Sequence, residues 1–308
     1  MKISVIIPFL NESDNLPILV DSLNAFFGKN TLYETEVIFV DDGSSDDSIK
    51  VLHSLTFIGY TGVLVKLSRN FGSHAALRAG TKIASGDYLV NTNADLQDPL
   101  SLIPLLFEKC EQGADIVWAH RKNSNLAFFD RIFSNFYSYL VRKFINPNYP
   151  KMGLDVVMFS KKIKSELDEN PELNSSFFLQ IMNFGFKQDQ IYFIKEKRKK
   201  GKSKWTFSKK VKLMVDTFIA FSFAPIRMVT IIGISLSIIG FIWTIYIILR
   251  QLIVGDLASG WPALISILLI GFGVTNLALG ILAEYLWRTL DASRNRKPFI
   301  IENYSKLN

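Results

Sequence analysis

Short apolar runs alternate with amphipathic segments along about the first 160 residues of the chain. The apolar runs are rich in β-branched side chains, as in Ile3–Ile7 and Val37–Val40, whereas the segments between them repeat apolar positions at helical spacing. The expected strands are 3–7, 36–40, 63–67, 88–91 and 115–119, and the expected helices are 15–27, 46–55, 74–84, 100–112 and 126–145. This order predicts an α/β fold with a mostly parallel sheet that carries helices on both faces.

Two much longer apolar runs follow, at residues 228–249 and 261–283, and neither contains a charged side chain. A helix of 22 residues, the length of the first run, rises about 33 Å, and the hydrocarbon core of a bilayer is about 30 Å thick. A pair of buried core helices is the alternative, but charge-free runs of this length are rare in soluble folds. The pattern therefore predicts a transmembrane helix hairpin over residues 227–287.

Basic side chains flank this hairpin on its outer sides. They are Lys209, Lys210, Lys212 and Arg227 before the first run, and Arg288, Arg294, Arg296 and Lys297 after the second. The connector 250–260 holds only Arg250 and Asp256, so the positive-inside rule places both ends of the chain in the cytoplasm. We therefore expect residues 288–308 to form a cytoplasmic C-terminal tail.

The segment 206–226, just before the hairpin, is rich in aromatic and basic residues. We expect an interfacial helix that lies on the bilayer, with an ordinary packing helix of the soluble domain as the alternative. Residues 195–212 hold ten basic residues and one acid, and they carry most of the excess behind the net charge of +7. Beside a membrane such a run suits anionic headgroups or a phosphorylated lipid better than nucleic acid, and a solvated charge run is the alternative.

The composition agrees with a membrane protein of a reducing compartment. Hydrophobic residues make up 49% of the chain, which is more than is usual for a soluble enzyme. The single Cys110 excludes an internal disulfide. The first ten residues contain only a short apolar stretch without a small-residue cleavage site, so we expect no signal peptide.

Carboxylates, amides and a hydroxyl gather where three of the expected strands end. They belong to Asn11 and Glu12 after the first strand, Asp41, Asp42 and Ser44 after the second, and Asn93, Asp95, Gln97 and Asp98 after the fourth. Pro8 directly follows the first strand and is a further candidate at this edge. Ligands of open α/β sheets bind at the carboxyl ends of the strands, and such oxygen atoms suit Mg²⁺ or Mn²⁺ shared with a diphosphate. The stretch 41–46 has an alternative interpretation as a tight turn that caps the next helix.

Four ordered segments resemble the family 2 glycosyltransferases of the GT-A fold. They read Pro-Phe-Leu-Asn-Glu at 8–12, Val-Asp-Asp-Gly-Ser at 40–44, Leu-Ser-Arg-Asn-Phe-Gly at 67–72 and Ala-Asp-Leu-Gln-Asp-Pro at 94–99. More narrowly, the chain looks like the polyisoprenyl-phosphate glycosyltransferases, the group of dolichol-phosphate mannose synthase and bactoprenol glucosyltransferase. The apolar hairpin matches the bacterial bactoprenol branch, and a cytoplasmic GT-A domain would then span residues 1–205.

The resemblance implies an activity and a location. The expected reaction moves a sugar from a nucleotide diphosphate onto a polyprenyl phosphate such as undecaprenyl phosphate. UDP-glucose is the first choice of donor, and UDP-N-acetylhexosamine, GDP-mannose and UDP-aminoarabinose derivatives are the alternatives. It implies a multi-pass protein of the bacterial inner membrane whose product serves envelope glycans. It also implies Mg²⁺ or Mn²⁺ as cofactor and a homo-oligomer, a tetramer in relatives, with no nucleic-acid partner.

The resemblance also assigns roles to the polar residues at the strand ends. The nucleotide would be held by Pro8, Asn11, Glu12, Asp41, Asp42, Ser44, Arg69 and Asn93. Asp95 and Gln97 would bind the metal, with Asp95 counted among the catalytic residues. The family usually writes its metal motif Asp-x-Asp, whereas this chain has Asn93 at the first position. The loss of one formal charge should weaken metal binding or leave more of it to Asp95 and the diphosphate.

The acceptor phosphate is mostly dianionic at neutral pH, since its second pKa is about 6, and needs cations more than it needs a strong base. Our candidates for these cations are Arg121, Arg131, Arg198 and Lys204. Asp155 lies in a segment, 154–158, that resembles the family's Gly-Asp-Phe-Arg-Leu, with Leu154 and Val157 departing from it. We expect Asp155 to be a catalytic base or an orienting group, with a helix cap or a salt bridge as the alternative.

Two other functions compete with this interpretation. A processive polysaccharide synthase of the same fold would normally have more membrane spans and a Gln-x-x-Arg-Trp motif, which is absent from the sequence. A catalytically inactive membrane scaffold that only binds a nucleotide-sugar would account for Asn93. The transferase remains the interpretation that the four segments favour.

Overall fold

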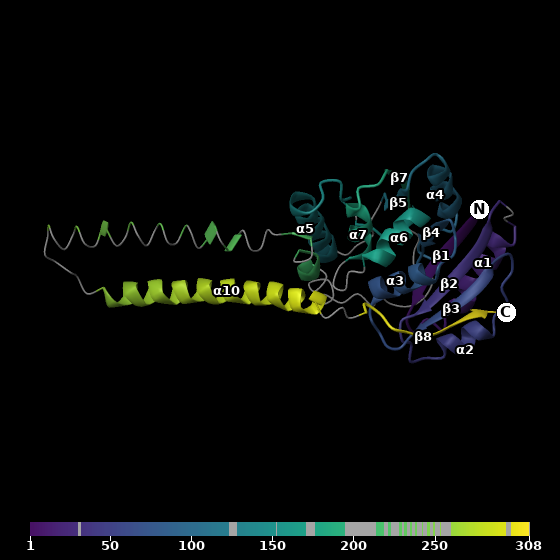
Figure 1. Ribbon diagram of the computed structural model, residues 1–308, viewed down its shortest axis with the longest axis horizontal. Coiled ribbons are helices and arrows are strands. Elements are labelled where there is room, and N and C mark those ends of the chain that lie inside the picture. The colour runs from purple at the N-terminus through teal and green to yellow at the C-terminus, as the bar shows by residue number, and fades with distance from the viewer. Residues whose placement is uncertain are drawn as a thin grey trace. The chain divides into compact units, whose positions relative to one another are not determined.

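The computed structural model describes residues 1–29, 32–122, 128–151, 153–170, 176–194, 214–218, 260–293 and 297–307, with separate positions between 221 and 253 (Figure 1). The chain divides into two compact units. Unit 1 comprises Met1–Asp216 and Lys297–Asn308, and unit 2 comprises Thr217–Arg296.

Within the described residues, unit 1 is built on one eight-stranded sheet in the order β7-β5-β6-β4-β1-β2-β3-β8. The strands are β1 (Lys2–Phe9), β2 (Glu34–Asp41), β3 (Thr61–Leu67), β4 (Tyr88–Asn91), β5 (Ile116–Arg121), β6 (Val156–Ser160), β7 (Gln188–Phe193) and β8 (Ile301–Leu307). β1 pairs in parallel with β2 and β4, as do β2 with β3 and β5 with β7. The predicted mostly parallel α/β sheet is confirmed.

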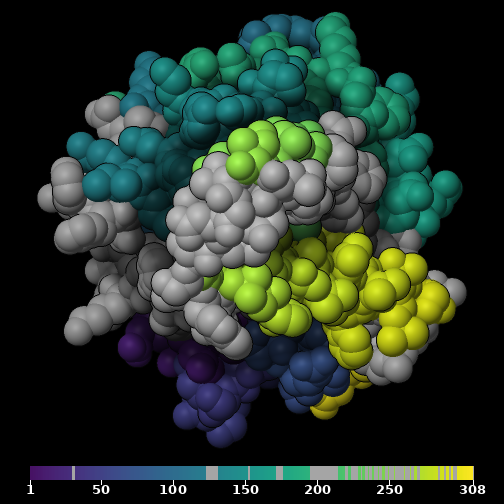
Figure 2. Space-filling view, turned by 90° about the vertical axis from the view of Figure 1, so that its left-hand side faces the viewer, coloured from purple at the N-terminus to yellow at the C-terminus, as the bar shows by residue number. Residues whose placement is uncertain are grey.

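Helices cover both faces of the sheet, as predicted. They are α1 (Leu16–Phe27), α2 (Ser48–His53), α3 (Ser73–Ile83), α4 (Leu102–Glu111), α5 (Phe128–Phe144), α6 (Lys161–Glu169) and α7 (Phe177–Asn183). Buried side chains of α1, α2 and α4 join the cluster that contains Val5 and Ile7. On the other face α3 approaches closely, because a Cβ at Gly80 would overlap Ile6 and stand 3.0 Å from Val40 Cγ2. In the space-filling view the purple N-terminal segments lie at the bottom and the teal segments that follow β4 at the top (Figure 2).

Three strands of the sheet, β6, β7 and β8, were not predicted. β6 comes from the stretch 147–160, in which no strand or helix was expected, and it lies antiparallel between β4 and β5. Because β6 is antiparallel to both neighbours, β4 and β5 run in the same direction and their carboxyl ends share one edge. β8 lies antiparallel to β3, where Lys66 and Glu302 form an ion pair of 3.0 Å. Part of the expected C-terminal tail is therefore an edge strand of unit 1.

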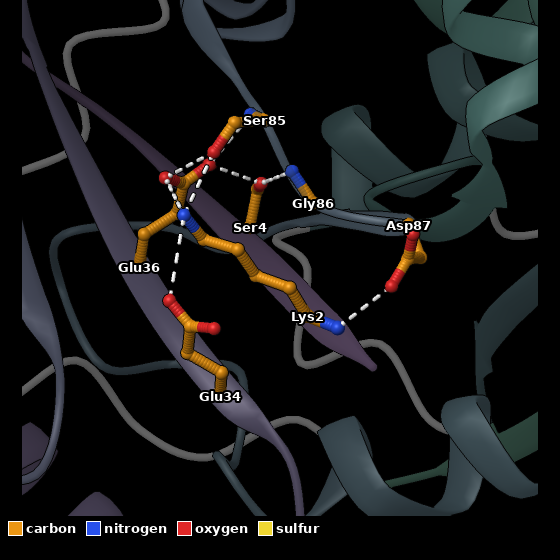
Figure 3. Close-up of polar contacts among 7 residues, drawn as sticks. All are labelled: Lys2, Ser4, Glu34, Glu36, Ser85, Gly86 and Asp87. Carbon is orange, nitrogen blue, oxygen red and sulfur yellow. Dashed lines mark hydrogen bonds and ion pairs between the residues drawn. The ribbon is translucent and has the colours of Figure 1, made fainter.

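A polar cluster joins the amino ends of β1 and β2 to the turn that precedes β4 (Figure 3). The buried carboxylate of Glu36 accepts hydrogen bonds from Ser4 Oγ at 2.5 Å and from the backbone N–H and hydroxyl of Ser85 at 2.7 and 2.8 Å. Lys2 Nζ lies 2.9 Å from the same carboxylate, and the N–H of Gly86 donates to Ser4 Oγ at 2.8 Å. Both carboxylate oxygens of Glu36 thus have partners. These contacts hold the amino ends of β1 and β2 against the turn before β4.

Unit 2 contains α10 (Trp261–Ser293), in which the hydroxyl of Tyr285 donates to the carbonyl oxygen of Ser222 at 2.9 Å. No helix formed by the described residues combines the length and the apolar character needed to cross a bilayer. Most of the first expected span, 228–249, and most of the expected interfacial segment, 206–226, lie outside the described residues. The membrane hairpin stays a prediction.

Candidate active site

Hydrogen bonds link the loops that follow β1 and β2 at the carboxyl edge of the sheet. The side-chain oxygen of Asn11 accepts the N–H of Ser45 at 2.7 Å, and the N–H of Asn11 donates to Ser44 Oγ at 2.8 Å. Asn11 adopts a φ of 50°, in the left-handed region that asparagine tolerates better than most residues. Next to it, the N–H of Glu12 donates to Ser48 Oγ at 2.8 Å. Asn11 and Ser44, two predicted nucleotide-binding residues, therefore position both loops.

The neighbouring carboxylates of Asp41 and Asp42 have different surroundings. Asp41 is fully buried; its Oδ1 accepts the N–H of Ser44 at 3.0 Å, while its Oδ2 finds no hydrogen-bond partner among the residues that the structure describes. Asp42 accepts the N–H of Phe71 at 2.7 Å and that of Gly72 at 3.0 Å. A buried oxygen without a partner is costly unless a ligand supplies a donor. Asp41 can thus accept a hydrogen bond from a ligand, whereas Asp42 holds the loop after β3 through hydrogen bonds to its backbone.

The loop after β3 packs tightly against the loop after β2. A Cβ at Gly43, which has a φ of +76°, would lie 2.6 Å from both the carbonyl carbon of Arg69 and the nitrogen of Asn70. The exposed Arg69 places its guanidinium 4.3 Å from the centre of the Phe71 ring. Pro8 pairs with Val40 in the strand register just before these loops. Arg69 therefore lies beside the predicted nucleotide residues of β1 and β2.

The loop after β4 carries the predicted metal ligands. Asn93 donates from its side-chain nitrogen to Asp98 Oδ2 at 2.7 Å, and Asp95 Oδ1 accepts the N–H of Gln97 at 3.2 Å. Leu96, between them, has a φ of 55°, a conformation that costs free energy for a residue with a side chain. The bond to Asp98 holds the amide of Asn93, whose oxygen is the atom that could bind a cation.

This donor set fits a hard divalent cation. The half-buried Asp95 and Gln97 offer oxygen atoms, which Mg²⁺ and Mn²⁺ prefer. In the described part of the chain no group of three or more His, Cys, Asp or Glu side chains is arranged to hold a metal. A cation here would therefore take one carboxylate from the protein and most of its other ligands from a bound diphosphate and water.

Arg121 and Asp155 form an ion pair at the same edge. Arg121 Nε, at the end of β5, lies 2.7 Å from Asp155 Oδ2, just before β6, and the side chains are 18% and 22% exposed. Asn91, the last residue of β4, donates its side-chain N–H to the carbonyl oxygen of Asp155 at 2.7 Å and accepts the N–H of Val157 at 2.9 Å. The pair is thus fixed to β4, which leads into the loop that carries the predicted metal ligands. The salt bridge that we considered for Asp155 exists, and its partner is a predicted phosphate ligand.

Tyr149 lies close to this pair and was not predicted. Burial, together with the nearby Tyr137 and the charge of Asp155, raises the pKa of Tyr149 well above its usual value, so its hydroxyl stays protonated. Asn91 was also missed, although a single amide at the end of an apolar strand is the signal that could have found it. Arg131 is exposed on the first turn of α5. Arg198 and Lys204 lie outside the described residues.

Residues 4–168 match the sequence pattern of glycosyl transferase family 2. The chain belongs to this family. The resemblance seen in the four sequence segments is therefore confirmed, and the protein is a glycosyltransferase enzyme.

Similar proteins match this family 2 enzyme along nearly its whole length. A prophage bactoprenol glucosyl transferase homolog of Escherichia coli (strain K12) is 32% identical over 99% of this chain and 100% of its own length. An undecaprenyl-phosphate 4-deoxy-4-formamido-L-arabinose transferase of Proteus mirabilis (strain HI4320) is 31% identical over 98% of this chain and 93% of its own.

A solved structure shares the fold. Glucosyl-3-phosphoglycerate synthase from Mycobacterium tuberculosis, in complex with Mn²⁺, UDP and phosphoglyceric acid, has a TM-score of 0.50 and 18% sequence identity. The likeness covers 70% of this chain and 76% of that one. It shows that the two proteins have the same fold.

Proposed function

We propose that the enzyme transfers a sugar from a nucleotide diphosphate, with UDP-glucose as the first candidate, to a polyprenyl phosphate such as undecaprenyl phosphate. The observation that carries the proposal is that oxygen ligands for a metal and a cation for a phosphate lie at one edge of the sheet. Oxygen-rich loops follow β1, β2 and β4, and the cation Arg121 ends β5 beside them. The names of the two whole-length relatives, both transferases of bactoprenol or undecaprenyl-phosphate chemistry, support the same reaction.

The donor nucleotide would bind at the loops after β1, β2 and β3. The buried Oδ2 of Asp41 would accept a hydrogen bond from the base or the ribose, as carboxylates at strand ends do in other nucleotide-binding sheets. The residues proposed to line this site are Pro8, Asn11, Glu12, Asp41, Asp42, Ser44, Arg69 and Asn93. Asn11, Ser44 and Asp42 would act mainly by shaping the loops, since their polar atoms bind neighbouring backbone.

Asp95 and Gln97 would hold Mg²⁺ or Mn²⁺ against the donor diphosphate. When bound, the cation would neutralise the charge that develops on the leaving diphosphate. Asp95 would supply the carboxylate that contacts the cation. Its hydrogen bond from the N–H of Gln97, across the turn at Leu96, orients that carboxylate.

The reaction is a single displacement that inverts the anomeric carbon. An oxygen of the acceptor phosphate forms a bond to that carbon while the bond between the carbon and the diphosphate oxygen breaks. A dianionic phosphate is already nucleophilic, so the main barrier is the approach of two anions. Arg121, Arg131, Arg198 and Lys204 are the proposed cations that lower it, and Asp155 is the acidic residue beside Arg121.

The polyprenyl acceptor implies that the enzyme works at a membrane. The runs 228–249 and 261–283 are long enough to form two spans, and their basic flanks favour cytoplasmic chain ends in a bacterial inner membrane. We include this topology, and a homo-oligomeric assembly, in the proposal.

The test is turnover by the purified full-length enzyme with radiolabelled UDP-glucose, undecaprenyl phosphate and Mg²⁺. We expect one lipid-linked sugar per acceptor, no product without the lipid, and no product in excess chelator. A panel of other nucleotide-sugars identifies the donor if UDP-glucose is inactive. A long polymer would instead establish a processive synthase, and tight nucleotide-sugar binding without any product from the whole panel would establish a scaffold. Either result overturns the proposal.

A further inference from the structure

The ion pair of Arg121 and Asp155 raises a question that the proposed reaction leaves open. A phosphate-binding arginine is already neutralised by a carboxylate, and both belong to the same sheet edge. A dianionic acceptor does not need a base, and Asp155 beside it would repel it. The pair must therefore do something other than proton abstraction.

We propose that Asp155 is a positioning residue that holds Arg121 in place until the acceptor phosphate arrives, and that the phosphate then takes over the guanidinium. The inference rests on the proposed function and concerns its acceptor site. In the free enzyme the carboxylate orients Arg121 and cancels its charge. In the complex the more highly charged phosphate replaces the carboxylate as the partner of Arg121.

The surroundings of the pair support such an exchange. Asp155 is fixed through its backbone, because Asn91 binds its carbonyl oxygen and the N–H of Val157. Its side chain can therefore release Arg121 without any change in the path of the chain. Arg121 contacts the carboxylate through Nε, and a guanidinium carries five N–H donors that match the oxygens of a phosphate in pairs.

The hydroxyl of Tyr149 also lies beside the pair, next to Gly153. A Cβ at Gly153, which has a φ of +79°, would lie 3.9 Å from Arg121 Nη2 and 3.8 Å from the Tyr149 hydroxyl. Gly153 thus lies next to both of these donors. Arg121 is mostly shielded from water and Tyr149 is buried, and this strengthens a hydrogen bond from either side chain to an anion.

The experiment compares Asp155→Asn with wild type. Asparagine keeps an oxygen that can accept the Nε–H of Arg121 but removes the competing charge. We expect the KM for undecaprenyl phosphate to fall by about three- to tenfold and kcat to fall by less than about tenfold. A general base would give the opposite split, because its loss lowers kcat by about 10²–10⁴ and leaves KM unchanged.

A double-mutant cycle shows whether Asp155 acts through Arg121. Arg121→Ala should raise the acceptor KM. In that background, Asp155→Asn should no longer lower the acceptor KM. The matched control is Asp168→Asn, which removes the carboxylate of the 2.6 Å pair with Lys164 on α6 and should leave the acceptor KM as it is. An Asp155→Asn effect that persists in the Arg121→Ala background overturns the proposal.

Direct binding separates this inference from the proposed function. Farnesyl phosphate is a soluble prenyl phosphate, and its affinity for the full-length enzyme saturated with UDP can be measured by calorimetry. Asp155→Asn should bind it more tightly and Arg121→Ala more weakly, with UDP affinity the same in both variants. Equal affinities in wild type and Asp155→Asn would refute the exchange even if turnover is normal, and the expected order would support it even if the sugar donor is another nucleotide.

Discussion

Asp41 and Asp42 are adjacent in the sequence, and the structure predicts opposite consequences for the same substitution at each. Asp41→Asn keeps the oxygen that accepts the N–H of Ser44 but replaces the unpartnered, buried Oδ2 with an NH₂ group. The substitution removes a buried charge and breaks no hydrogen bond within the described residues. We therefore expect the melting temperature of the free enzyme to stay level or rise.

The same substitution should weaken nucleotide binding, because an NH₂ group cannot accept a hydrogen bond from the ligand. A hydrogen bond to a charged group contributes about 1.5–3 kcal/mol, which corresponds to a roughly 10- to 150-fold increase in Kd. Calorimetric titration of the purified enzyme with UDP measures this change. A Kd within threefold of the wild-type value would refute the role given to Asp41.

Asp42→Asn is the matched control. Its two carboxylate oxygens accept the N–H groups of Phe71 and Gly72, so an NH₂ group at either position faces a backbone donor. Leaving such donors unsatisfied costs about 1–3 kcal/mol. For a domain of about 150–250 residues this corresponds to a fall in melting temperature of about 2–12 °C. If both variants lose the same stability, our distinction between a ligand-binding and a bracing carboxylate is wrong.

Three further predictions concern other parts of the enzyme. Asp95→Ala should abolish turnover while the circular dichroism spectrum shows that the fold is intact; near-normal turnover would refute the metal assignment. Arg131→Ala, on the exposed first turn of α5, should chiefly raise the KM for the lipid acceptor, and an effect confined to UDP would move the residue out of the acceptor site. Burial raises the pKa of Glu36, but hydrogen bonds from Lys2 and two serines outweigh it and lower the pKa below 4.5. The carboxylate thus stabilises the fold above pH 4.5 and loses this effect as the pH falls through the lowered pKa, so the difference in melting temperature between wild type and Glu36→Gln should shrink on acidification.

The sequence was most informative where burial is strong. All five expected strands exist, because runs such as Val37–Val40 are covered on both faces and therefore read as continuous apolar stretches. β6 is equally buried, but its place between β4 and β5 depends on pairing with strands far away in the chain. β8 is mostly exposed, so no alternation of apolar and polar residues marks it.

The sequence could predict which residues share one edge of the sheet, but not which of them contact one another. The strand-end rule correctly grouped the carboxylates of β1, β2 and β4, since parallel neighbours bring their carboxyl ends together. It could not show that Asn11 binds the neighbouring loop or that Asp155 meets Arg121. These facts depend on loop conformations and on the antiparallel insertion of β6, which leave no periodic signal.

The C-terminal strand has a practical consequence for anyone who shortens or tags this enzyme. β8 covers the otherwise open side of β3, and the N–H of Ser68, next to Arg69, donates to the carbonyl oxygen of Ile300 at 3.0 Å. A truncation before residue 300 would leave the backbone N–H and C=O groups of β3 unpaired at the sheet edge. Other copies of the protein could pair with this edge, so the truncated protein should aggregate more readily. It would also free the backbone beside Arg69, a proposed nucleotide-binding residue. Loss of activity in such a deletion would therefore say nothing about the apolar runs 228–249 and 261–283 removed with it.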